Sequence, residues 1–113
     1  MPFINVKTNI PVHAESREII KKKLGEAITA LPGKTEAWLM VGIEPEISLY
    51  FKGDPSPAAM VDVSILGGAS AAAYNRLTEI ICNILSEELE IPADRTYVKY
   101  SETENWGWNG SNF

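Results

Sequence analysis

The sequence predicts an α+β fold in which duplicated βαβ units form a four-stranded mixed sheet with two helices on one face. Three observations predict this fold. Two long segments carry apolar residues at helical spacing, strand-like segments lie on both sides of each, and the second unit repeats the first with an offset of about 57 to 61 residues. With 113 residues, the chain is expected to form a single domain over residues 1–113.

The first unit begins with a short strand at residues 3–8, where apolar and polar residues alternate. An amphipathic helix follows from about Ala14 to Leu31, because its apolar residues recur at steps of three and four. Pro32-Gly33 ends that helix. The apolar and aromatic segment 37–43 is expected to be a strand, largely buried if both of its faces are covered, and 47–51 a further short strand.

The second unit follows the same plan. Residues 60–66 predict a strand, because β-branched side chains occupy one face and polar side chains the other. Ser70 is expected to cap a helix that runs to about Leu89, and residues 95–100 form the next strand. The tail 105–113 is rich in turn residues and aromatic residues, so it is expected to dock on the rest of the protein.

Crossover helices between parallel strands place both helices on one face of the sheet. The strands also carry apolar residues on their other side. This pattern, together with the extra short strands at 47–51 and at the C-terminus, predicts that other subunits cover the open face. The expected state is therefore an oligomer with short strands at its subunit interfaces.

Charge and composition exclude several classes of protein. Ten Lys and Arg residues against fifteen Asp and Glu residues give a net charge of −5, which opposes binding to a phosphate backbone. No apolar run approaches the roughly 20 residues that cross a bilayer. The single cysteine, Cys82, excludes an internal disulfide, and the single histidine, His13, cannot supply the ligands of a zinc site. We expect no nucleic-acid partner, no membrane span and no metal.

Pro2 directly follows Met1, and many proteins begin in this way without any catalytic reason. Removal of the initiator methionine, which is usual before a small second residue, would leave a free secondary amine. An ordered set of motifs gives this proline its context: Pro2, Gly33-Lys34, Ser64-Ile65, Asp94-Arg95-Thr96-Tyr97 and Gly107-Trp108-Asn109. In this set, and in its duplicated βαβ plan, the chain resembles the macrophage migration inhibitory factor family of the tautomerase superfamily over essentially its whole length.

The resemblance implies a symmetric homotrimer whose sheets surround a central channel, with a pocket at each subunit interface. It implies keto-enol tautomerisation of phenylpyruvate-like aromatic α-keto acids and of dopachrome derivatives, with Pro2 as the catalytic general base and with neither metal nor organic cofactor. The physical argument agrees, because a nearby cation and an apolar pocket both disfavour a protonated amine and lower its pKa.

Three further residues match family site positions. Lys34 matches the lysine that binds the substrate carboxylate, although a lysine after a helix C-terminus is also favourable for the helix. Ile65 matches a position whose backbone N–H holds a substrate oxygen, and it can serve as a core residue at the same time. Tyr97 matches the tyrosine that a neighbouring subunit contributes to the pocket, or it is simply an aromatic residue of the interface.

Other positions depart from the family pattern, so the substrate preference is expected to differ from that of better-known members. Lys99 replaces an asparagine, and it either adds a second cation to the pocket or lies exposed at the sheet edge. Trp106 replaces a small aliphatic residue beside the matching Trp108, where it would narrow the pocket or stack on an aromatic substrate. Trp38 stands where tyrosine is frequent. The segment 66–69 replaces a lysine-containing loop.

Two other functions stay open. The resemblance also implies a cytokine-like secreted protein that acts on a cell-surface receptor and keeps the pocket in a vestigial or secondary role. A noncatalytic oligomeric scaffold is the third reading. The N-terminal residues lack the basic stretch and apolar core of a signal peptide, so the expected location is the cytoplasm. Export by an unconventional route would leave no mark in the sequence.

Overall fold

The computed structural model describes all residues from Met1 to Phe113. Two long helices and six strands follow one another in this order: β1 (Pro2–Thr8), α1 (Ala14–Ala27), β2 (Met40–Glu44), β3 (Ala59–Leu66), α2 (Ala71–Leu89), β4 (Thr96–Thr103), β5 (Gly107–Trp108) and β6 (Ser111–Asn112). Single 3₁₀ turns occupy Ile28–Ala30, Glu36–Trp38 and Ala93–Arg95. Neither long helix has the length and apolar character needed to span a membrane.

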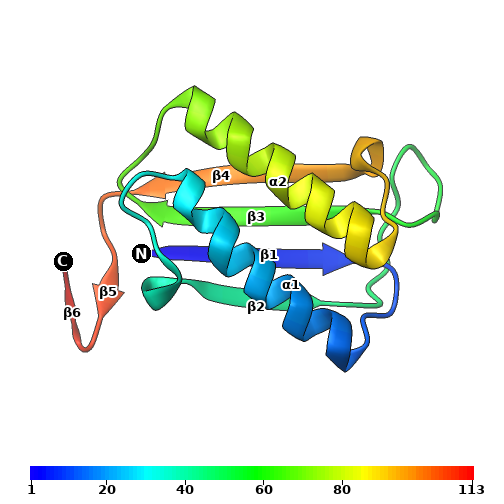
Figure 1. The fold of residues 1–113 in the computed structure, drawn as a ribbon, viewed down its shortest axis with the longest axis horizontal. Helices are drawn as coiled ribbons and strands as arrows, with labels where there is room; N and C mark the ends of the chain where they lie inside the picture. The colour runs from blue at the N-terminus through cyan, green and yellow to red at the C-terminus, as the bar shows by residue number, and fades with distance from the viewer.

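The four long strands form one mixed sheet in the order β2-β1-β3-β4. The pairs β1–β2 and β3–β4 are parallel, and the central pair β1–β3 is antiparallel. Each parallel pair is joined through one helix, and Figure 1 shows α1 and α2 side by side on the same face of the sheet. The predicted duplication of a βαβ unit and the predicted α+β fold class are therefore confirmed.

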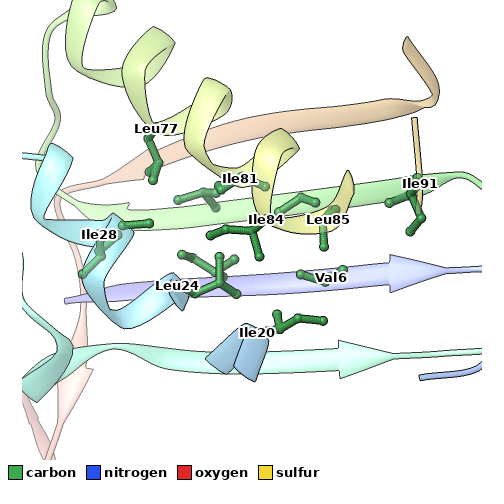
Figure 2. Close-up of a cluster of buried hydrophobic side chains, with 14 of the residues drawn as sticks. Val6, Ile20, Leu24, Ile28, Leu77, Ile81, Ile84, Leu85 and Ile91 are labelled. Carbon is green, nitrogen blue, oxygen red and sulfur yellow. The ribbon is translucent and has the colours of Figure 1, made fainter. Parts of the chain in front are cut away.

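The core lies between this face of the sheet and the two helices. Alternate residues of β1 and β3 are buried, as a strand with one covered face requires. Seventeen buried residues form one apolar cluster. Figure 2 shows helix side chains such as Leu24 and Ile81 gathered over the sheet that carries Val6. This layer fixes where the ends of the strands lie, and the candidate site is at one of those ends.

The helix boundaries follow their local sequence. The first predicted helix forms, but α1 ends at Ala27 and its last turn tightens into the 3₁₀ turn. Gly33 then takes a positive φ of 80°, which is the conformation that glycine adopts without strain. The side chain of Ser70 caps α2 by accepting a hydrogen bond of 3.1 Å from the Ala73 N–H, as predicted.

Two strand predictions are corrected. Residues Glu36–Trp38 form a 3₁₀ turn, so the strand expected at 37–43 begins only at Met40. The strand expected at 47–51 does not form, and only a single bridge joins Phe51 to Asp54 there. The chain crosses the end of β1 at this point, where the Ile47 N–H donates to the Thr8 carbonyl at 3.1 Å. No strand of the same chain lies alongside the segment to pair with it.

The remaining strands agree with prediction. The strand expected at 95–100 forms as β4 and extends to Thr103. The tail folds into the β5–β6 hairpin and contacts the turn that contains Trp38, as the docking prediction required. The face of the sheet that lacks helices is mixed in character, with exposed Met40 and Tyr97 beside the Lys99–Asp62 ion pair. Its coverage by other subunits stays a prediction.

Candidate active site at the N-terminal edge of the sheet

The first residue of β1 lies beside the last residues of β3, at one end of the two central strands. This end of the strands is called the edge of the sheet below. Pro2 is buried and faces Ile65 of the antiparallel partner. Proline fits this first strand position because it has no N–H to donate to the ladder. The Met1 carbonyl accepts a hydrogen bond of 3.1 Å from the Leu66 N–H. These contacts fix the position of the α-amino end of the chain.

Lys34 approaches the same point from the loop after α1. Its ammonium donates a hydrogen bond of 2.9 Å to the Leu66 carbonyl oxygen. The positive φ of Gly33 turns the chain so that Lys34 leaves the helix toward the sheet edge. The structure thus brings together Pro2 and Lys34, two residues that the sequence predicted to share a site.

The α-amino group of Met1 has a pKa below its ordinary value of 8.0. Burial is the larger cause, because removal from water disfavours the charged form. Repulsion by the positive charge of Lys34 is the second cause. An amine at this edge of the sheet therefore loses its proton at a lower pH than an exposed amine does.

Ile65 is 0% exposed and belongs to the core. The N–H groups of a strand point alternately toward its two neighbours. Because the Leu66 N–H donates to Met1 and the Gly67 N–H donates to Thr103 of β4, the Ile65 N–H points toward β4. Leu66, which the sequence indicated only as the first residue of the 66–69 segment, supplies the backbone donor that faces the start of the chain.

Tyr97 and Lys99 lie far from Pro2 within one chain. Tyr97 faces Met60 on β3, five positions from Ile65, which corresponds to about 16 Å along the strand. Tyr97 is 61% exposed, and its ring packs edge-on against Phe51 with the centroids 5.1 Å apart. A single chain does not bring Tyr97 to the proline, and a contribution from a neighbouring subunit stays a prediction.

Lys99 is on the open face of the sheet. Its ammonium lies 3.2 Å from a carboxylate oxygen of Asp62, the residue opposite it on β3. The Lys99 side chain is 64% exposed. Within one chain, Lys99 is thus an exposed lysine of the edge strand whose charge Asp62 compensates, and a role in a pocket stays a prediction.

Aromatic residues from two distant segments meet beside the C-terminal hairpin. The rings of Trp38 and Trp108 pack edge-on with centroids 5.0 Å apart. Phe113 stacks on Trp108 at 6.0 Å, and its N–H donates to the Trp106 carbonyl at 3.1 Å. Figure 1 shows this hairpin at the same edge of the sheet as the N-terminus. Phe113 was missed from the sequence, where the only signal was its position at the end of an aromatic tail.

Two shallow hollows lie at this end of the sheet in the single chain. One is lined by Trp108, Ser111, Asn112 and Phe113, and another by Gly67, Glu102, Thr103 and Glu104. Pro2 and Lys34 line neither. No group of three or more His, Cys, Asp or Glu side chains converges in a way that could hold a metal ion. The chemistry available at this edge consists of an amine, a cation, a backbone donor and aromatic surface.

Comparisons with known proteins extend over the whole chain. The family model described as macrophage migration inhibitory factor (MIF) matches residues 1–113. The macrophage migration inhibitory factor of Rattus norvegicus is 30% identical over 115 residues, which cover 100% of this chain and 99% of the rat protein. The Brugia malayi homolog is 29% identical over the same shares of the two chains.

Solved structures agree with the sequence comparisons. The crystal structure of Leishmania major MIF2 has a TM-score of 0.94 to this chain at 30% identity, covering 100% of this chain and 97% of that one. The Toxoplasma gondii macrophage migration inhibitory factor has a TM-score of 0.91 at 19% identity, covering 98% of this chain and 99% of that one. At this lower identity, the second likeness concerns the fold alone.

Proposed function

Because the chain belongs to the macrophage migration inhibitory factor family, we propose that it is a keto-enol tautomerase of aromatic α-keto acids with Pro2 as its general base. One observation carries this proposal. The Lys34 ammonium is held at the edge of the sheet where β1 starts, and together with burial it lowers the pKa of the terminal amine. A base that works near neutral pH needs such a lowered pKa.

The proposal requires that Met1 is removed, so that the nitrogen of Pro2 becomes the terminal amine. Pro2 is itself buried in the strand pair. Burial and the Lys34 charge act on a Pro2 amine in the same direction as on the Met1 amine, because both disfavour a positive charge at this place. The neutral secondary amine is then available to accept a proton.

The same removal frees a hydrogen-bond donor. In the chain with Met1, the Leu66 N–H donates to the Met1 carbonyl, which leaves together with that residue. The freed N–H belongs to the same residue, Leu66, whose carbonyl oxygen holds the Lys34 ammonium. Preorganised donors of this kind stabilise the negative charge that develops on an oxygen during reaction.

The reaction moves one proton between carbon and oxygen. In the direction from ketone to enol, the Pro2 amine takes a proton from the carbon next to the keto group, and the electron pair of that C–H bond forms the carbon–carbon double bond. The resulting enolate oxygen then receives the proton from the Pro2 ammonium, which restores the neutral amine. In the reverse direction, Pro2 delivers the proton to carbon.

Substrate selection follows from charge and aromatic surface. Lys34 suits a carboxylate, and the rings of Trp38, Trp108 and Phe113 at the same edge suit an aromatic group. Phenylpyruvate combines the two, and dopachrome derivatives are a second expected class. Trp106, whose carbonyl holds Phe113, would narrow the entrance.

We propose further that the working unit is a homotrimer. The shallow hollows of the single chain and the distance of Tyr97 from Pro2 support a pocket that is completed by a second subunit. In that arrangement, Tyr97 and Lys99 of one subunit serve the Pro2 site of its neighbour.

The enzymatic test measures phenylpyruvate conversion between about pH 5 and pH 9 on protein whose N-terminus is verified by intact mass. Trimmed protein is expected to be active, and its kcat/KM is expected to rise with pH through an apparent pKa below that of an ordinary amine. Protein made while methionine aminopeptidase is inhibited keeps Met1 and is expected to be inactive.

The matched variant is Pro2→Gly, which supplies a primary amine at the same place. Its expected loss of kcat/KM is at least about tenfold. A folded and trimmed Pro2→Gly protein with full activity would contradict the proposed role of Pro2. An inactive trimmed wild-type protein would contradict the enzymatic proposal itself.

The full-length match to the rat macrophage migration inhibitory factor favours a second candidate, a secreted protein that acts on a cell-surface receptor. A macrophage migration assay on trimmed wild-type and Pro2→Gly protein separates the two candidates. Activity of both proteins in migration, with loss of turnover only in the variant, would support receptor binding that does not need the catalytic site.

A further inference from the structure

Leu66 carries both contacts that organise the candidate site. Its N–H bonds to the start of the chain, and its carbonyl oxygen holds the Lys34 ammonium. This is the one hydrogen bond that the Lys34 side chain makes within the chain. The orientation of the Leu66 peptide groups therefore decides where the cation lies relative to the terminal amine.

The segment that follows Leu66 is intrinsically flexible. Gly67 has a positive φ of 82°, and Gly68 comes directly after it. Glycine restricts the backbone less than any other residue, so two consecutive glycines give the end of β3 little local rigidity. A precise position of Leu66 needs contacts from other elements.

Two side chains from other elements supply those contacts. The Tyr74 hydroxyl, from the first turn of α2, accepts a hydrogen bond of 3.1 Å from the Ala69 N–H and donates a short hydrogen bond to the Glu102 carboxylate of β4. The same carboxylate packs against Gly68, since a Cβ built on Gly68 would lie 2.6 Å from it. The Gly67 N–H also donates to the Thr103 carbonyl at 2.8 Å.

The position of Tyr74 is in turn fixed by contacts with Tyr100. Its ring lies 4.4 Å from the ring of Tyr100, and the Tyr100 hydroxyl donates to the Tyr74 carbonyl at 3.0 Å. Burial, together with the neighbouring Glu102 carboxylate, raises the pKa of Tyr74 to about 12. The phenol thus keeps its proton at every pH at which the terminal amine titrates, and the bond to Glu102 persists across that range.

We infer that Tyr74 and Glu102 are positioning residues of the candidate active site: they fasten the Gly67–Ala69 loop and thereby hold Leu66, and with it Lys34, beside the N-terminal amine. The inference rests on the proposed function of that amine. Figure 1 shows the β3–α2 connection, the end of β4 and the N-terminus at one edge of the sheet. Tyr74 and Glu102 therefore need to act only over a short distance to fix the position of Lys34.

The experiment compares Tyr74→Phe with Tyr100→Phe in trimmed, full-length protein. Tyr74→Phe removes the hydroxyl that joins the loop to Glu102. Tyr100→Phe is the matched control, because it keeps the ring that packs on Tyr74 and removes only a hydroxyl whose partners, Thr78 and the Tyr74 carbonyl, belong to α2 and not to the loop. Two quantities are measured: phenylpyruvate turnover, and the pH dependence of the alkylation rate of the terminal amine.

In Tyr74→Phe we expect KM to rise about fivefold to tenfold with a smaller change in kcat, because Lys34 contributes mainly to binding the carboxylate. We also expect the pKa of the amine to rise toward its ordinary value as Lys34 moves away. The single variant Glu102→Gln keeps a hydrogen-bonding partner for the phenol and is expected to retain most of the wild-type behaviour. Tyr100→Phe is expected to match the wild type in both measurements.

The alkylation measurement does not depend on turnover. It therefore distinguishes a failure of the tautomerase proposal from a failure of the positioning role. Inactive wild-type protein combined with a raised amine pKa in Tyr74→Phe would overturn the tautomerase proposal and support the positioning role. Active wild-type protein with unchanged KM and unchanged amine pKa in a folded Tyr74→Phe protein would overturn the positioning role. An equal shift in Tyr100→Phe would also overturn it, because the effect would then be a general loosening of α2.

Discussion

Lys34 and Leu66 are 32 positions apart in the sequence, and the Lys34 ammonium nevertheless lies 2.9 Å from the Leu66 carbonyl oxygen. This hydrogen bond joins the loop after α1 to the last residue of β3. The N–H of the same Leu66 reaches Met1 at 3.1 Å. A cation and the start of the chain are thereby held by the two peptide groups that flank one residue, Leu66, and this relationship motivates the first prediction.

Lys34→Ala is expected to raise the pKa of the terminal amine, because the repulsion that disfavours its protonated form is lost. The rise of kcat/KM with pH should move to higher pH, and kcat/KM below the midpoint should fall at least about tenfold. A pH profile of phenylpyruvate turnover measures both effects. Lys22→Ala removes an exposed lysine from α1 and serves as the control. An unchanged midpoint together with an unchanged kcat/KM in Lys34→Ala would remove Lys34 from the mechanism.

Leu24→Ala should destabilise the fold by about 2–5 kcal/mol, because Leu24 is fully buried between α1 and the sheet and its truncation leaves a cavity. Ile19→Ala, on the same helix, removes a side chain that is 43% exposed and should cost less than about 1 kcal/mol. Denaturant unfolding of both variants checks this. Equal costs would mean that α1 does not pack as described.

Arg95→Lys should release the loop between β2 and β3. The Arg95 guanidinium, with 15% of its side chain exposed, donates to the carbonyl oxygens of Phe51, Asp54, Ser56 and Pro57. A lysine ammonium cannot reproduce this planar set of donors, so a loss of about 1–3 kcal/mol is expected. Hydrogen exchange at residues 51–57 should accelerate.

The control for Arg95→Lys is Arg76→Lys. Arg76 is exposed and makes one ion pair, with Glu79. Exposed pairs of this kind contribute little, so neither unfolding nor exchange should change measurably. Similar exchange in the two variants would show that Arg95 is not what orders the loop.

A subunit-mixing experiment tests whether Tyr97 acts across an interface. Pro2→Gly and Tyr97→Ala chains are each expected to be poorly active alone. If each pocket combines Pro2 of one subunit with Tyr97 of its neighbour, refolding an equal mixture should give about a quarter of the wild-type activity, since random pairing restores both residues at that share of sites. No recovery in correctly assembled mixtures would place both residues in the same subunit's site, and full activity of Tyr97→Ala alone would exclude Tyr97 from the site.

Local patterns explain why much of the fold could be predicted from the sequence. The helical spacing between Ala14 and Leu31 and the alternation at 60–66 both reflect burial against one face, and the structure has both elements. The Ser70 cap was predictable because it depends on residues three positions apart. Pro2 and Lys34 could be placed together only because the motif set resembled a known family.

The features that the sequence predicted wrongly or did not predict have a common physical cause, because each depends on contacts between segments that are distant in the sequence. Trp38 lies in a turn because its ring packs on Trp108, seventy positions away, and periodicity does not detect such a contact. Residues 47–51 have the composition of a strand but no partner strand within the chain. The roles of Tyr74 and Glu102 were equally hidden, because the hydrogen bond between them joins a helix start to a strand end.

The pseudo-symmetry of the two βαβ units also explains why such a site would occur once and not twice. Arg95 occupies in the second unit the place that Lys34 occupies in the first, after the helix and before the paired strand. The strand of the first unit starts at the α-amino end of the chain, whereas the strand of the second is preceded by a peptide bond, whose nitrogen is not basic. The equivalent cation therefore has no amine to act on and instead binds four loop carbonyls. The two units thus share one framework, in which Lys34 lies beside an amine and Arg95 orders a loop.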